Sequence, residues 1–163
     1  LGVGMSLDIE NFLDAYAIAA PQIFSHSHYR RSLARLVMTV LMMREDRKIR
    51  TQEVELIKKI ARAKFDLDEK NGQALCDELC ADNEHEPSLD ELVAYIKENS
   101  TPIECADCIR EMWEIAVCDN ELHVRENKFA QRCGKLLGVD MDEVTWLKEL
   151  AVVVHSDDGN AAS

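Results

Sequence analysis

Two stretches of the sequence repeat one spacing of an aspartate, an aliphatic residue and a glutamate. The first stretch holds Asp46, Ile49 and Glu53. The second holds Asp119, Leu122 and Glu126. Because carboxylate oxygens are the ligands that hard divalent cations prefer, these two acidic frames are candidates for a metal site.

Part of this spacing matches the end of an EF-hand loop, in which an aliphatic residue precedes the last glutamate ligand. In that alignment, the first two ligand positions of the second frame would be Ile115 and Val117, which are apolar. The first frame fails in the same way, with Met42 and Arg44 at these positions. An EF-hand is therefore excluded.

Two interpretations of the frames remain. In the structural one, each frame is a tight loop between helices: the aspartate accepts backbone N–H groups, and the glutamate occupies the first turn of the next helix. In the functional one, the loop acids converge on a hard cation, with calcium, magnesium and manganese as the candidate cofactors. No organic cofactor is predicted.

The two frames differ in the charges that surround them. Asp46 and Glu53 lie among four basic residues that oppose cation binding, which are Arg44, Arg47, Lys48 and Arg50. The second frame has only His123 and Arg125 nearby. We therefore predict a metal site in the second half, formed by Asp119, Glu121 and Glu126, in preference to Asp46 and Glu53.

The elements that must position these acids are predicted to be helices. Apolar residues recur at helical spacing along nearly all of the 163 residues, and Gly and Pro are few. The sequence predicts an all-α fold, a single bundle of about seven or eight short helices. We divide it into an N-terminal segment with the first helix (1–32), a duplicated helical domain (33–152) and a flexible tail (153–163).

The repeat extends beyond the acidic frames. A shift of 73 positions aligns them, and dropping one residue then matches Phe65–Asp68 with Leu137–Asp140. A duplicated helical unit explains this agreement. We predict two similar three-helix units related by an approximate twofold axis, with residues 33–69 superposing on 106–141.

The two D-x-x-[IL]-x-x-x-E frames, in an acidic all-helical domain of this size, resemble the TerB-like family of tellurite-resistance proteins. The resemblance covers residues 33–152. It implies an internally duplicated helical fold whose acidic loop residues bind divalent metal. It also implies a role in resistance to tellurite and other stresses, as an adaptor in larger, partly membrane-linked assemblies.

Carried over by position, the family aspartate matches Asp46 and Asp119, and the family glutamate matches Glu53 and Glu126. The glycine that usually follows the family aspartate is absent, and Arg47 and Asn120 stand in its place. Asn tolerates a left-handed backbone and Arg does so poorly, which again favours the second loop.

Composition limits the classes of partner. The net charge of −12 argues against nucleic acid and anionic membrane surfaces, and it suits cations or basic partners. The longest apolar run, Leu36–Met43, is too short to insert across a bilayer. No arrangement of nucleophile, base and scaffold is recognisable, so we predict a non-enzymatic protein that binds other proteins. The alternative is a structural interaction domain without metal.

Six cysteines and the absence of a recognisable secretory signal predict reduced thiols in the cytoplasm. Cys105 and Cys108 fall on an apolar helical face, where Cys behaves as a small hydrophobic residue, so we predict no bound zinc. Trp113 and Trp146 are predicted to be core residues.

Overall fold

The structure is a computed structural model that describes residues 9–18, 27–45, 48–81, 86–120 and 123–162. Within these residues all regular secondary structure is helical, which confirms the all-α prediction. Residues 9–14 are helical and lead into η1 (Ala15–Ile18). The helices that follow are α2 (Ser27–Met43), α3 (Thr51–Phe65), α4 (Glu69–Cys80), α5 (Leu89–Glu98), α6 (Pro102–Ala116), α7 (Val124–Leu136) and α8 (Met141–Ala162).

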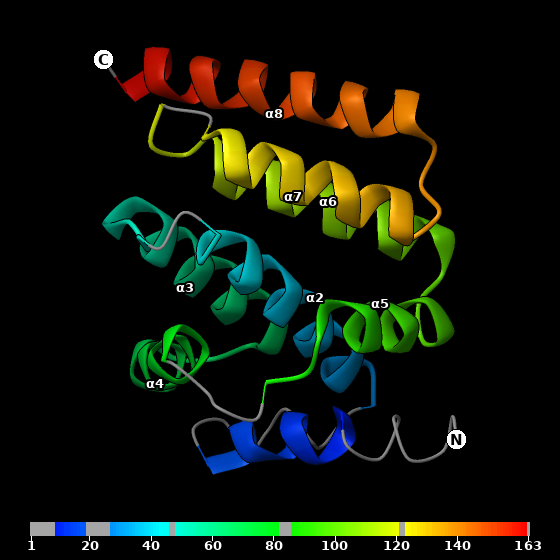
Figure 1. Ribbon diagram of the computed structural model, residues 1–163. Coiled ribbons are helices and arrows are strands. Elements are labelled where there is room, and N and C mark those ends of the chain that lie inside the picture. Colours follow the sequence, from blue (N-terminus) through cyan, green and yellow to red (C-terminus); the bar gives the residue numbers. More distant parts are fainter. Residues whose placement is uncertain (1–8, 19–26, 46–47, 82–85, 121–122, 163) are drawn as a thin grey trace.

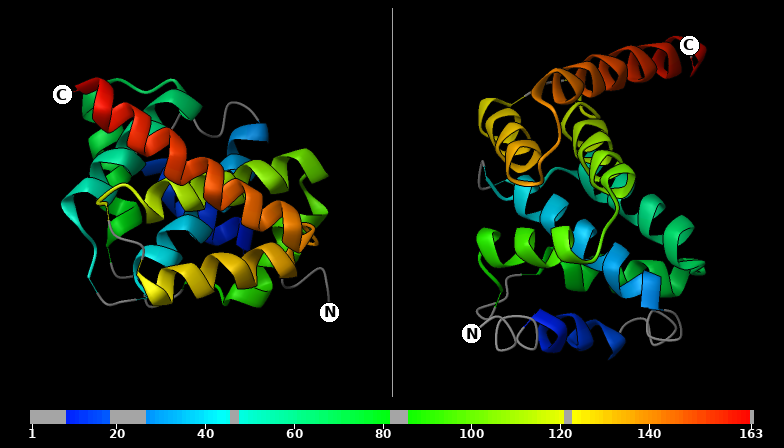
Figure 2. Two further views of the ribbon diagram at one scale, coloured as in Figure 1. Left: turned by 90° about the horizontal axis from the view of Figure 1, so that it is seen from above. Right: turned by 90° about the vertical axis from the view of Figure 1, so that its right-hand side faces the viewer.

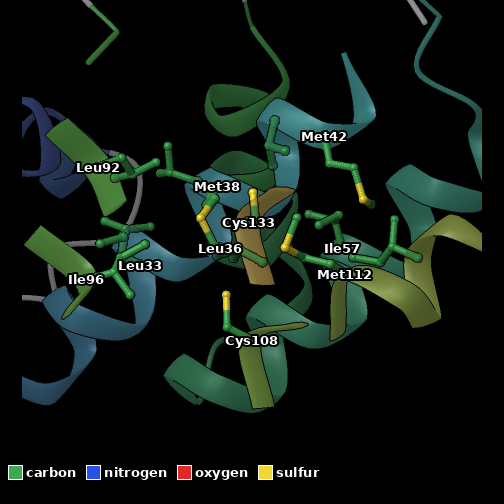
Figure 3. Close-up of a cluster of buried hydrophobic side chains, with 14 of the residues drawn as sticks. Leu33, Leu36, Met38, Met42, Ile57, Leu92, Ile96, Cys108, Met112 and Cys133 are labelled. Carbon is green, nitrogen blue, oxygen red and sulfur yellow. The ribbon is translucent and has the colours of Figure 1, made fainter. Parts of the chain in front are cut away.

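Helix α2 forms the centre of the bundle, because it packs against α3, α4, α5, α6 and α7. The N-terminal helical segment lies at one end of the molecule and α8 forms the outer layer at the opposite end (Figures 1 and 2). Between them is one continuous apolar core. Figure 3 shows part of this core, to which α2, α3, α5, α6 and α7 contribute Leu33, Leu36, Met38, Met42, Ile57, Leu92, Ile96, Cys108, Met112 and Cys133.

The helix boundaries repeat at the predicted offset. Helices α2 and α6 end at the equivalent residues Met43 and Ala116, and α3 and α7 begin at the equivalent residues Thr51 and Val124. After the one-residue deletion, Glu69 at the start of α4 corresponds to Met141 at the start of α8. The helix order of the two halves therefore matches as the duplication predicts.

The third helices of the two halves differ. Helix α4 packs mainly against α3, whereas α8 packs mainly against α6. Helix α8 is also much longer and continues to Ala162, so residues 153–162, which were expected to form a flexible tail, are helical. Within the described residues, none of the helices combines the length and the apolar character needed to cross a membrane.

Candidate functional site

The N-termini of α3 and α7 meet where the two halves of the molecule face each other. Arg50 is the N-cap residue of α3 and His123 is the N-cap residue of α7. These residues are equivalent at the 73-residue offset, and Nη2 of Arg50 lies 3.3 Å from Nδ1 of His123. The duplication has therefore brought two corresponding positions into contact.

The guanidinium group of Arg50 lies among three carboxylates. Its Nε is 3.1 Å from Oδ2 of Asp119, and its Nη1 is 3.2 Å from Oε1 of Glu126. The same Nη1 is 3.6 Å from Oε1 of Glu53, on the first turn of its own helix. We call these five residues the Arg50 cluster: Arg50, Glu53, Asp119, His123 and Glu126.

The carboxylates of this cluster are removed from solvent. Glu53 is 1% exposed and Glu126 is 0% exposed, and these are the only charged residues classed as buried in the described part of the chain. Asp119 is nearly buried, while the side chain of Arg50 is 19% exposed. Because a buried carboxylate is costly unless it is paired, this point of the fold requires a positive charge.

His123 links Arg50 to Asp119. An arginine can only donate hydrogen bonds, so Nδ1 of His123 is the acceptor in its contact with Arg50. Nε2 of His123 is 3.0 Å from Oδ2 of Asp119, and it must donate because the carboxylate accepts. The neutral imidazole with its proton on Nε2 satisfies both contacts and orients Asp119.

Local backbone geometry fixes the acids in place. The backbone N–H of Arg50 donates to Oε1 of Glu53 at 3.0 Å, which anchors that carboxylate at the start of α3. After Asp119 the chain turns through Asn120, which has a φ of 68°, a left-handed conformation that Asn tolerates. Oδ1 of Asn120 lies 2.8 Å from Nε2 of His155, so α8 also holds this loop.

The negative charge of the cluster acts on a neighbouring thiol. The pKa of Cys118 is raised to about 12, chiefly by burial and further by the charges of Glu53, Asp119 and Glu126. Both effects disfavour the thiolate at neutral pH. The cluster thus adds to the cost of placing another anion beside it.

A comparison with protein-family models matches residues 32–149 to the family described as "Tellurite resistance protein TerB". The chain belongs to the TerB family. Comparisons with curated proteins and with solved structures gave no match. The matched part of the TerB domain contains both acidic frames and the whole Arg50 cluster.

The TerB domain brings together three of the five predicted ligands, namely Glu53, Asp119 and Glu126. The other two, Asp46 and Glu121, lie outside the described residues. The expectation that His123 and Arg125 are the only basic residues near the second frame was wrong, because Arg50 contacts both Asp119 and Glu126. Arg50 is far from Asp119 in the sequence, but the fold places residue 50 opposite residue 123.

The three carboxylates of the Arg50 cluster suit a hard cation, because their donor atoms are oxygens. The guanidinium of Arg50 nevertheless lies against these same oxygens. Among the residues that the structure describes, no group of three or more acidic, His or Cys side chains is arranged to hold a metal ion. At the described residues of the Arg50 cluster, a cation would compete with Arg50 for the oxygens of Asp119 and Glu126.

The remaining candidate residues of the TerB domain fall in the core or on the surface. All six cysteines are free thiols, and Cys105 and Cys108 are buried on α6 as predicted. Trp113 is fully buried, but Trp146 is 57% exposed, so its assignment to the core was wrong.

Proposed function

We propose that this TerB-family chain is a non-enzymatic stress-response domain that binds a divalent cation at the Arg50 cluster and acts as an adaptor between proteins. Calcium, magnesium and manganese are the proposed ions. One observation carries the cation proposal: three nearly buried carboxylates, drawn from both halves of the fold, share a single positive group. The proposed setting is tellurite resistance in the cytoplasm, with partners that include a membrane-associated stress-response complex.

In this proposal a cation would take the place of the Arg50 guanidinium. Asp119 and Glu126 would hold the ion, while Arg50 turns towards solvent and Glu53 remains anchored by the backbone of α3. The ion supplies positive charge that joins the two interhelical loops. Affinity is modest, because binding breaks existing ion pairs and because the positive ends of the α3 and α7 dipoles disfavour a cation.

The alternative is a purely structural interaction domain without metal. The observation that favours it is the position of Arg50, whose guanidinium already pairs with Glu53, Asp119 and Glu126. In that case the cluster joins the two halves permanently. Arg50 of the first loop then provides the positive charge that Asp119 and Glu126 of the second loop require.

Titration calorimetry and thermal unfolding with calcium, magnesium and manganese test the proposal. Three proteins are compared: the wild type, Asp119→Asn/Glu126→Gln, and Arg50→Gln. We expect weak binding by the wild type, none by the acid-neutralised variant, and about tenfold tighter binding by Arg50→Gln, which lacks the internal competitor. Glu78→Gln/Glu98→Gln is the control, since it removes two exposed acids of α4 and α5.

The outcomes separate the two candidates. Binding by Arg50→Gln alone would show that the carboxylates accept an ion but that Arg50 excludes it from the wild type, which supports the structural role. No heat and no thermal stabilisation in any of the proteins would end the cation proposal. Equal losses in the control and in Asp119→Asn/Glu126→Gln would show only a response to net charge.

A further inference from the structure

Helix α8 carries apolar side chains on the side that faces away from the bundle. Its inner side is formed by Val144, Leu147 and Ala151, which are buried in the core. Trp146 is 57% exposed and Val153 is 55% exposed, while Leu150 between them is half-buried. At 3.6 residues per turn these three lie within about 60° of one another around the helix. We call Trp146, Leu150 and Val153 the α8 stripe.

Among the helices that the structure describes, none covers this stripe, because α8 is the outermost layer of the bundle (Figures 1 and 2). The apolar surface also continues around the helix. Val154, next to Val153, lines a cleft of about 440 Å³ together with Leu56 of α3 and Val117, the C-cap residue of α6. An exposed tryptophan with aliphatic neighbours is the kind of surface that protein interfaces bury.

The charges beside the stripe identify the kind of partner. Asp142, Glu143 and Glu149 are exposed on α8. The helix has one Lys or Arg residue, Lys148, and its Nζ turns inward to lie 5.6 Å from the ring centre of Trp113. On α8 itself the stripe is therefore flanked by acids without an exposed Lys or Arg, while Lys59 of α3 lies in the adjoining cleft beside Glu55 and Glu114. This pattern complements an apolar surface with basic flanks and repels a second copy of the same acidic face.

We infer that the α8 stripe is a docking surface for a basic amphipathic helix of a partner protein. This inference rests on the adaptor role proposed above and adds the surface and the chemistry of the partner. Trp146 is the anchor, Leu150 and Val153 extend the apolar contact, and Glu143 and Glu149 pair with the Lys or Arg residues of the bound helix. The contact between His155 and Asn120 holds α8 against the body of the protein while the partner docks.

The probe for this surface is a synthetic amphipathic peptide of about five helical turns, with leucine on one face and lysine on the other. A matched peptide carries glutamate in place of lysine. Binding is measured by calorimetry and by acrylamide quenching of tryptophan fluorescence, which reports Trp146 because Trp113 is fully buried. We expect the lysine peptide to bind and to protect Trp146, and the glutamate peptide to bind at least about tenfold more weakly.

Variants locate the contact. Trp146→Gln/Val153→Gln leaves the net charge unchanged and should weaken the lysine peptide by about tenfold or more. Ile103→Gln is the control, since Ile103 is 75% exposed on α6, outside the stripe. Glu143→Gln/Glu149→Gln should weaken binding more than Glu78→Gln/Glu98→Gln, which removes the same charge elsewhere.

Four results would overturn the inference. They are no binding of the lysine peptide, equal binding of both peptides, unchanged affinity in Trp146→Gln/Val153→Gln, and a concentration-dependent dimer that this variant abolishes. Protection of Trp146 by neutral phosphatidylcholine vesicles without peptide binding would instead assign the stripe to a lipid surface. Calcium titration of the stripe variant keeps the two proposals apart, because it should leave any cation binding at the Arg50 cluster unchanged.

Discussion

The two interhelical loops have the same spacing but carry different residues at one decisive position, a permanent cation in the first and a neutral imidazole in the second. The N-cap of α3 is Arg50 and the N-cap of α7 is His123, and they are in contact. Arginine at both positions would place two guanidinium groups against each other, and histidine at both would leave the carboxylates without a permanent cation. The difference makes the two halves electrostatically complementary, because Arg50 of the first half pairs with Asp119 and Glu126 of the second.

The contact between the second and third helices of each half also differs between the halves, in the size of the packed side chains. In the first half, Gly72 of α4 lies against the side chain of Arg62 on α3. In the second half the small residue is on the other helix, because Gly134 of α7 lies against Val144 of α8. Residue 72 corresponds to residue 144 once the one-residue deletion is included. The equivalent helix contact therefore has its glycine on the third helix in the first half and on the second helix in the second half.

The largest expected effect comes from removing the shared cation. Arg50→Ala leaves Glu53, Asp119 and Glu126 without the guanidinium that pairs with them. Breaking a buried ion-pair group in this way should lower the free energy of unfolding by about 3 kcal/mol. Urea denaturation measures the loss.

The control for this prediction is Arg110→Ala. Arg110 pairs with Asp107 and Glu114 on the surface of α6, where ion pairs contribute about 0.5 kcal/mol. Similar losses for the two variants would show that Arg50 is an ordinary surface arginine. The halves would then not depend on each other through it.

A second comparison concerns what holds the far ends of the third helices. Arg44 donates to the carbonyl oxygens of Leu79 and Ala81 at the end of α4, at 2.8 and 2.6 Å, and pairs with Glu86. In the second half, His155 of α8 makes a single exposed contact with Asn120. Because Arg44 is a charged, part-buried donor, Arg44→Ala should lower the free energy of unfolding by about 2 kcal/mol. His155→Ala should lower it by about 0.5 kcal/mol.

Thermal and urea unfolding of the two single variants measure this difference. Amide hydrogen exchange adds the location, since Arg44→Ala should speed exchange at the C-terminal end of α4 and His155→Ala at the loop around Asn120. A larger loss for His155→Ala would reverse the comparison and make the contact with α8 the main restraint.

The sequence predicted those features that depend on local pattern. Helical spacing of apolar residues predicted the all-α class, because that signal lies within a few turns of chain. The 73-residue repeat predicted the loop positions and the family, because it compares two such local patterns with each other. The contact of Arg50 with Asp119 was missed because it joins residues from different halves. The offset itself contained the clue, since corresponding N-caps of a twofold pair can face each other.

The exposure of Trp146 and the length of α8 were missed for a different reason. Periodicity shows that a helix has an apolar face, but it does not show whether another element covers that face. Helix α8 is the last element, so Trp146 has no later helix in the described chain to pack against. The apolar positions that follow, from Val152 to Val154, continue the helix instead of marking its end.

The smallest expected effect comes from alanine at the two buried helical glycines, Gly72 and Gly134. A Cβ at Gly134 would lie 2.6 Å from Cγ2 of Val144, which is buried and β-branched and cannot easily rotate away. A Cβ at Gly72 would clash with Cγ of Arg62, whose side chain is exposed, so relief requires another χ1 rotamer and the loss of the long 3.4 Å hydrogen bond from its Nε to the carbonyl oxygen of Leu67. Alanine favours the helix by about 1 kcal/mol at either position, whereas overpacking costs about 1–3 kcal/mol. We therefore expect Gly134→Ala to lower the free energy of unfolding by about 1 kcal/mol and Gly72→Ala to change it little. The double variant Gly134→Ala/Val144→Ala separates the steric conflict from the helix propensity, because it removes the side chain that the new Cβ would meet. Urea denaturation measures the free energy of unfolding of each variant. An equal loss in Gly72→Ala and Gly134→Ala would mean that Arg62 yields to the new Cβ no more easily than Val144 does.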